Sequence, residues 1–421
     1  MRLRMTALAL PLWAALTPTA EAVELTSWLK LDGFGTLGAY RGDDGVAGVR
    51  PDGRNPNVSR DGDLRWDGDS LLSAQLTVNP QGKFRLVGQF IAKDDVIKRY
   101  KPRAEWMYLA YDVAPNLSVK LGRMVSLAFL LSETRNVNYA QTSVRPVSTV
   151  YIINTVTNLD GLSASWQTPL AGGDLQVDGA VGKSKVSVAA GTVDVPSLAS
   201  VAIKWSKDSF ALRYARSEFK VDLSFPATEL ALGTLASGRT ACINCAAVFA
   251  QRIPLKDIKG HLDTLAATYE IGNLSLQAEW AQRLADSAAL PDVNGKYLLA
   301  GYRMGALTPY AAIGRQRVTE PPLGLQTAAA APASARAANA AFDRFLQGLS
   351  GRDIWQIGLR WDLAENFALK FQYENIKNTQ DFRLGQNGTV SYPSPPPIGT
   401  YTGPAWDGKV RMLSVNLDFV F

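Results

Sequence analysis

Apolar and polar residues alternate along much of the chain with a period of two. In one clear case, apolar residues at 72, 74, 76 and 78 interleave with polar ones, and after the turn 79–82 the apolar residues at 84, 86 and 90 continue the same face. The same form returns around turns at 207–208, 272–273 and 364–366. This period is typical of strands with one apolar face, so each pair of segments predicts a β-hairpin.

Counted along the whole chain, the pattern predicts an all-β protein of about 16 strands. The predicted strands are 29–40, 69–79, 83–93, 104–113, 117–123, 159–167, 174–184, 198–206, 209–218, 261–271, 274–283, 296–304, 307–317, 353–362, 367–377 and 409–421. Short turns alternate with long connections at 41–68, 94–103, 124–158, 185–197, 219–260, 284–295, 318–352 and 378–408. This segregation is typical of a transmembrane antiparallel up-and-down β-barrel. An alternative with 18 strands counts 150–157 and 185–193 as extra strands.

Aromatic residues on the apolar face support the barrel interpretation. Trp166 and Trp361 lie near predicted short turns, whereas Phe90 and Trp280 lie near predicted long loops. Interfacial rings prefer the headgroup level, so a membrane barrel should carry one aromatic belt near each end of its strands. A soluble β-sandwich, the alternative, has no reason to form two belts.

The first 22 residues have the features of a secretory signal peptide. Arg2 and Arg4 form a positive start, 5–15 is an apolar stretch, and 20–22 reads Ala-Glu-Ala, a cleavage motif. No further run of about 18 apolar residues follows, so helical membrane spans are not expected. Residues 23–421 are predicted to form a single transmembrane β-barrel domain with long extracellular loops.

Composition narrows the chemistry. The chain has one His and two Cys, so histidine-rich metal sites and the common zinc folds are nearly excluded, and neither a metal nor a cofactor is expected. A formal net charge of +6 is too small to indicate nucleic-acid binding. Cys242 and Cys245 lie in a long loop of an exported chain, where we expect a local disulfide. A thioredoxin-like redox site would need a βαβ context, and a zinc site would need two more ligands.

The last predicted strand, 409–421, alternates apolar and polar residues and ends at Phe421. Together with Gly33-Phe34-Gly35-Thr36-Leu37 in the first strand and Leu121-Gly122-Arg123 in the fifth, this ending resembles the Gram-negative outer-membrane porins of the general trimeric type. The resemblance covers nearly the full length, although the Pro-Glu-Phe-Gly-Gly sequence of the general porins' third loop is absent.

The resemblance implies a water-filled channel in the bacterial outer membrane, through which small hydrophilic solutes and ions diffuse passively. It implies no enzymatic activity and no cofactor. The expected partners are outer-membrane lipid, two further copies of the chain in a homotrimer, and the barrel-assembly machinery during biogenesis. In that family the machinery reads the terminal aromatic residue, so Phe421 is the predicted assembly signal.

Residues of the opposite parity are predicted to face the pore, where their charge would influence ion selectivity. Cations outnumber carboxylates among them, which predicts a weak preference for anions; the alternative is that the charges pair with one another on a wet wall. The selected residues are Arg65, Arg85, Lys120, Arg213, Arg303, Arg360 and Lys370 against Glu279 and Glu374.

Loop 124–158 is long enough to fold into the pore and return. Its apolar stretches 127–131 and 150–153 would be poorly accommodated in water, which favours packing against the inner wall. Packing over the mouth, or an extra strand pair, is the alternative. The predicted charges of this constriction loop are Arg123, Glu133, Arg135 and Arg145. A second loop contains the Ala-rich stretch 327–349, which could form a helix with Phe342 on one face.

Other functions remain open on the sequence alone. A porin-scaffold adhesin and a substrate-specific channel are compatible with the loop lengths. A membrane-embedded hydrolase would need a nucleophile beside His261, and the sequence offers no recognisable partner there. A plugged receptor would need an N-terminal plug domain, whereas the first strand begins soon after the cleavage motif.

Overall fold

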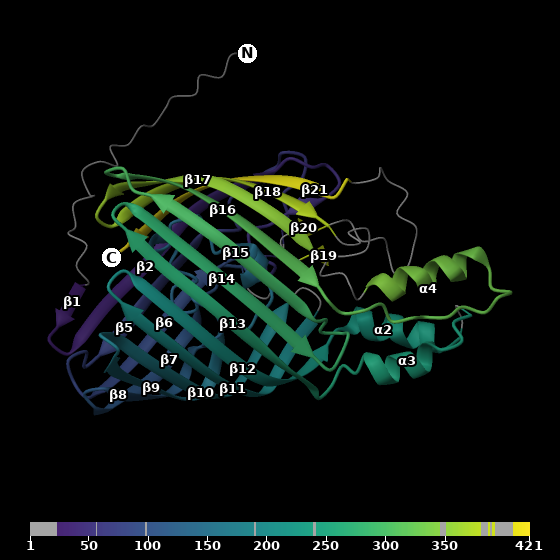
Figure 1. Cartoon of the computed structure of the whole chain (residues 1–421), viewed down its shortest axis with the longest axis horizontal. Coiled ribbons are helices and arrows are strands. Elements are labelled where there is room, and N and C mark those ends of the chain that lie inside the picture. Colours follow the sequence, from purple (N-terminus) through teal and green to yellow (C-terminus); the bar gives the residue numbers. More distant parts are fainter. Residues whose placement is uncertain are drawn as a thin grey trace, which may run out of the picture.

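Sixteen antiparallel strands close into a β-barrel in the computed structural model (Figure 1). The structure describes residues 23–55, 57–96, 99–188, 191–238, 241–345, 351–379, 386–387, 390–391 and 407–421. The barrel strands are β2 (Leu29–Gly42), β5 (Leu71–Val78), β6 (Phe84–Lys93), β7 (Arg103–Ala114), β8 (Leu117–Val125), β9 (Asn158–Leu170), β10 (Gly173–Val188), β11 (Gly191–Lys207), β12 (Phe210–Ser224), β13 (Ile258–Ile271), β14 (Leu274–Ala285), β15 (Val293–Tyr302), β16 (Leu307–Val318), β17 (Arg352–Ala364), β18 (Phe367–Asn378) and β21 (Lys409–Val420). Because β21 pairs with both β18 and β2, these strands form a closed ring.

The remaining strands are short and lie outside the ring. Strands β1 (Val23–Thr26) and β4 (Leu64–Arg65) pair with β2. Strands β3 (Gly48–Val49), β19 (Gln386–Asn387) and β20 (Val390–Ser391) form a separate small sheet. The predicted signal peptide 1–22 lies outside the described residues.

All sixteen predicted segments correspond to barrel strands, which confirms the 16-strand barrel. The 18-strand alternative is wrong because Val150 and Tyr151 belong to the helix α1 (Ser148–Tyr151), while 185–193 extends an existing hairpin. The predicted long loop 185–197 is wrong for the same reason, since β10 continues to Val188 and β11 begins at Gly191. Alternation continues through this extension, and Lys185 Nζ lies 3.3 Å from Asp194 Oδ2 across the two strands.

The outer wall of the barrel is apolar. Leu121 and Ile313 are 61% and 62% exposed, and their strand neighbours Lys120 and Gly314 have the opposite, inward parity. Exposed apolar residues recur in this way on strand after strand. Such a continuous belt is expected of a surface that contacts lipid and is unusual for a protein surrounded by water.

The end of the chain packs closely on the first barrel strand. Phe421 and Phe419 lie over Gly33 and Gly35, and a Cβ atom on Gly33 would come within 2.0 Å of the Phe421 ring. The two rings also stack on each other with centroids 6.5 Å apart. Glycine on β2 therefore provides the space for the terminal aromatic residues at the closing seam.

Three helices lie at the end of the barrel opposite the C-terminus (Figure 1). They are α2 (Pro226–Ala236), α3 (Cys245–Arg252) and α4 (Ala333–Phe345), and the third confirms the helix expected in the Ala-rich stretch. Leu235, Phe249 and Phe342 pack together in a small apolar core beneath them. Within the described ranges, none of the helices has the length and apolar character needed to cross a membrane.

Candidate pore constriction

Loop 126–157, which we call the inner loop, connects β8 to β9 and is bonded to the inner wall of the barrel. It contains the 3-10 helix η2 (Asn138–Ala140) and α1. Side chains from strands on several sides of the ring hold its backbone, so the loop crosses the interior instead of extending into solvent. These bonds include Arg213 Nη2 to Leu127 O (2.5 Å), Thr264 Oγ1 to Ala128 O (2.7 Å) and Leu130 N to Glu279 Oε1 (2.8 Å). In the opposite sense, the Thr149 hydroxyl of the loop donates to the Lys296 carbonyl oxygen of β15 (3.1 Å).

Glu279 of β14 is a central attachment point for the inner loop. Its side chain is almost completely buried and accepts three hydrogen bonds. The backbone N–H of Leu130 donates to one oxygen, and the hydroxyls of Tyr151 and Tyr297 donate to the other at 2.8 and 3.1 Å. Tyr151 belongs to the loop and Tyr297 to β15, so this carboxylate joins the loop to two neighbouring strands.

Lys370 and Arg360 hold the opposite stretch of the inner loop. Lys370 is completely buried, and its Nζ donates to the carbonyl oxygens of Asn138, Gln141 and Ser143 at 2.5, 2.6 and 3.2 Å. It also lies 3.0 Å from Asp418 Oδ2. Arg360 Nη1 donates to the carbonyl oxygens of Tyr139 and Gln141 at 2.6 and 2.9 Å. Both cations were predicted to attract ions from pore water, but the structure uses their donors to fasten the loop.

Arg145 fastens the inner loop at a third place. Its guanidinium makes two bonds to the Asp69 carboxylate, at 3.2 and 2.6 Å, and one to Ser414 Oγ at 2.7 Å. Glu374 Oε2 lies 3.6 Å from its Nη1. The two residues Glu374 and Arg145, which were predicted as separate pore charges, therefore face each other in a buried ionic cluster.

Apolar packing reinforces these polar ties. Phe129, Val150 and Ile153 of the loop lie in one buried cluster with inward-facing apolar residues of the wall. Gly295 allows the approach, because a Cβ atom there would come within 2.0 Å of the Thr149 carbonyl oxygen. The wall residues in this cluster are Tyr40, Leu262, Ala281, Val293, Tyr297, Leu299, Ala312, Val318, Ile354, Ile376, Val410 and Met412.

The other predicted pore cations are distributed over the height of the barrel. Lys120 faces inward on β8 and lies 5.3 Å from the Tyr108 ring centroid. Arg85 makes a bidentate pair with Asp112 near the short turns. Arg303, at the short-turn mouth, is 67% exposed, with its Nη2 3.6 Å from Asp362 Oδ2. Arg65 lies in β4, outside the ring, and pairs with Asp67.

The remaining charged residues predicted for the constriction loop lie in three different environments. Arg123 belongs to β8, not to the loop; it pairs in register with the outward Met107 and binds Asp160 on the outer face, with both bonds at 2.7 Å. Glu133 is an exposed loop residue. Arg135 donates to the carbonyl oxygens of Tyr151 and Asn154 and lies over the Tyr151 ring.

Several residues that hold the inner loop were not selected from the sequence. Asp69, Tyr151 and Tyr297 are the main examples. The sequence did contain an indication of a covering segment. Apolar residues such as Val293 and Ile354 are at strand positions that face the barrel interior, where a wall in contact with water would carry polar residues. That pattern could have indicated a covering segment, although not the particular partners.

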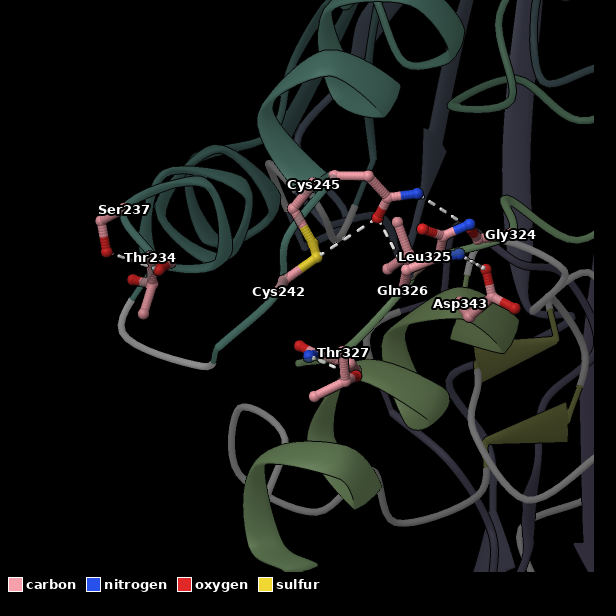
Figure 2. The surroundings of a disulfide bond; sticks show 11 residues. Thr234, Ser237, Cys242, Cys245, Gly324, Leu325, Gln326, Thr327 and Asp343 are labelled. Atoms are coloured by element: carbon pink, nitrogen blue, oxygen red, sulfur yellow. Dashed lines mark hydrogen bonds between the residues drawn. A yellow bond between two sulfur atoms is a disulfide. The ribbon is translucent and has the colours of Figure 1, made fainter. Parts of the chain in front are cut away.

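A turn closed by the disulfide Cys242–Cys245 contacts a second loop at the long-loop end, as Figure 2 shows. Asn244, between the two cysteines, accepts a bond from Gln326 N at 2.8 Å and donates to Gly324 O at 3.0 Å. Backbone bonds between 243 and 326 and between 241 and 328 extend the contact. The disulfide turn therefore docks on the segment that leads into α4.

His261, the residue considered for catalysis, lies on the outer wall of the barrel. His261 faces outward on β13, with Nε2 3.6 Å from Asp263 Oδ2 and Glu218 as its cross-strand neighbour. In the part of the chain that the structure describes, no group of three or more His, Cys, Asp and Glu residues is placed to hold a metal ion.

The closed 16-strand barrel is the fold of solved outer-membrane porins. Similar solved structures include an anion-selective porin from Comamonas acidovorans, at 13% identity and TM-score 0.54 over 93% of this chain and 99% of that one. OmpF of Salmonella typhi, in complex with daunomycin, has 12% identity and TM-score 0.54 over 94% and 98%. The channel DcaP of Acinetobacter baumannii has 11% identity and TM-score 0.52 over 95% and 99%.

No protein-family model matches the sequence, and no curated protein matches it. The structural likeness therefore establishes the fold, and the chemistry of this chain has to be argued from its own residues.

Proposed function

We propose that this protein is an outer-membrane porin that forms a narrow aqueous channel for small hydrophilic solutes and ions. The observation that carries the proposal is the inner loop, which is fastened within a closed barrel whose outer wall is apolar. A lipid-facing barrel with a polar interior provides a path for water, and a loop inside it narrows that path.

The ties around the inner loop support a low size limit for the solutes. Attachments to β12, β13 and β14 on one side and to β17, β18 and β21 on the other leave the loop little freedom to move aside. We expect ions and small metabolites to pass and larger sugars to be retarded.

A weak preference for anions is part of the proposal, and of the cations selected from the sequence it keeps Lys120 and adds Lys204. Lys120 and Lys204 face inward and make no ion pair with a carboxylate among the described residues. Arg360, Lys370 and Arg145 are instead paired or bonded to carbonyl groups. The effect should be small because salt screens free charges within about 8 Å.

Planar-bilayer recording tests both the channel and its preference for anions. The purified chain should give stepwise conductance, and a potassium chloride gradient should give a small zero-current potential of the sign for anion preference. Lys120→Glu with Lys204→Glu should shift that potential toward cation preference. The matched change Lys185→Glu, on the hairpin extension beyond the barrel wall, should leave it unchanged. A chain that inserts as a barrel but never conducts would contradict the channel proposal.

We further propose export by the 1–22 signal peptide, residence in outer-membrane lipid, recognition of Phe421 by the barrel-assembly machinery, and assembly as a homotrimer. The porin fold supports these four proposals. Cross-linking of the protein in native membranes, read as a three-copy band, tests the oligomer.

A further inference from the structure

A cavity of about 100 Å³ lies inside the barrel between loop 43–70 and the inner loop. Its lining includes Asp52 and Arg54 from the first of these loops, Lys93 at the end of β6, and Arg135 and Ser148 from the inner loop. The cavity is therefore bounded by the same segment that narrows the channel.

Two of the lining cations have no carboxylate partner among the described residues. Lys93 Nζ donates to the neutral Asn136 Oδ1 at 3.0 Å, and Arg135 donates to two backbone carbonyl oxygens. An ammonium has three donors and a guanidinium five, so each of the two retains donors for a ligand. Asn136 follows Arg135 in the chain, which brings the two charges to the same side of the cavity.

Most other charges of the lining are already neutralised. Arg145 binds Asp69, and Arg54 binds Asp95 at 2.5 Å. Arg99 Nε lies 3.4 Å from the Asp94 carboxylate. The positive charges of Lys93 and Arg135 are thus opposed by one remaining lining carboxylate, that of Asp52.

Asp52 is ionised and leaves an excess of one positive charge. Burial opposes ionisation of its carboxyl, but the cations Arg135, Lys93 and Arg54 outweigh burial and hold the pKa of Asp52 below its usual range. Ser148, which is nine-tenths buried, adds a hydroxyl whose Oγ has no hydrogen-bond partner among the described residues. Buried polar groups of folded proteins are normally satisfied, so an unpartnered hydroxyl in a polar cavity indicates a place for a bonded guest.

The cavity has room for a small guest. Its volume exceeds the roughly 30 Å³ that one molecule of liquid water occupies. A carboxylate such as acetate or an oxyanion such as phosphate is a guest that this space and its donors suit.

We propose that the cavity is a discrete binding site for one small oxyanion or carboxylate, with Lys93, Arg135 and Ser148 as its donors. The inference rests on the proposed channel function and deepens it, because an anion held beside the inner loop would enter the channel from a saturable site. It differs from a diffuse anion preference in having one occupant.

Direct titration of the folded full-length chain in detergent micelles tests the site independently of conduction. Sodium acetate and sodium phosphate at neutral pH and low ionic strength should each bind saturably, at one per chain, and each should displace the other. Methylammonium chloride should not bind because of its charge.

Lys93→Gln retains an amide that can bond to Asn136 but removes the charge, and Arg135→Gln is its counterpart. Each should weaken acetate binding about tenfold or more, since hydrogen bonds to charged groups contribute more than neutral ones. Lys93→Arg should keep binding. Lys83→Gln, which removes the same charge at the short-turn mouth, should have no effect.

The outcomes separate the two proposals. Binding to a chain that does not conduct would support the site and refute the channel. Conduction by a chain that binds neither acetate nor phosphate would overturn the site alone. Equal acetate affinity in Lys93→Gln, Arg135→Gln and the native chain, each folded as judged by heat-dependent gel migration, would also overturn it.

Discussion

Lys370→Met tests whether the inner loop depends on a buried cation. The replacement keeps an unbranched chain of similar length and removes the ammonium that joins three loop carbonyl oxygens to Asp418. Both Lys370 and Asp418 are completely buried, so neither the carboxylate nor the carbonyl groups gain water unless the loop moves.

The expected free-energy cost of Lys370→Met follows from this burial. Removing one member of a buried ion pair typically costs about 3–5 kcal/mol, because the other charge is left uncompensated. At about 1.4 kcal/mol per factor of ten, this corresponds to a shift of roughly two to three orders of magnitude toward the released loop. Arg360, Arg145 and Glu279 still hold other parts of the loop, so we expect local release with the barrel intact.

Single-channel recording measures the consequence. Lys370→Met should increase the mean conductance and the current noise, while its SDS-gel migration without heating stays that of a folded barrel. Adding Asp418→Asn should recover part of the native behaviour, since the unpaired carboxylate is then absent. The two single variants and the double variant together form a double-mutant cycle, which measures the coupling between Lys370 and Asp418. Lys120→Met is the matched control, because it removes an inward cation that makes no bond to the loop. Native noise and conductance in Lys370→Met would refute the anchoring role.

Three further outcomes are expected. The mature chain should migrate differently on an SDS gel before and after boiling, because a closed barrel has no free strand edge; identical migration would contradict the barrel. Deleting Phe421 should reduce the amount of assembled protein in the membrane while the assembled fraction conducts normally, and a normal yield would remove its role as a signal. Replacing Cys242 and Cys245 by Ser should speed proteolysis between 238 and 257 without changing barrel migration, and unchanged cleavage would show that the disulfide does not stabilise the docked turn.

The strands were predictable because their information is local. A period of two identifies each strand, and one lipid-facing side makes the period visible over its whole length. The segment 185–197 was predicted as a loop because its Gly and Pro residues resemble a connection. In the structure Pro196 lies at a register shift of β11, between the pairs formed by Asp194 and Ser197, so the hairpin continues past it.

The role of the inward cations was less predictable, because parity gives a direction and not a partner. Lys370 and Arg360 do face inward, but their donors are taken by carbonyl oxygens about 220 residues away in the chain. Arg50 illustrates the same limit for a loop residue. It would be expected at an exposed rim, yet it is 4% exposed and bonds to the carbonyl oxygen of Asn55.

The buried ties also bear on why selectivity should be modest. A cation that donates to several carbonyl groups keeps its charge, but when a carboxylate lies within 3–4 Å, as Asp418 does for Lys370, their fields largely cancel at longer distance. The inner loop is held mainly by such neutralised groups, including Arg145 with Asp69 and Glu374. Among the described residues, the cations that have no carboxylate partner and can act on a passing ion include Lys120 and Lys204 in the lumen and Lys93 and Arg135 beside the loop. Stability of the constriction therefore depends on paired cations such as Lys370 and Arg145, and selectivity on the lumen cations Lys120 and Lys204, so a substitution in either of these two sets should leave the other property nearly intact.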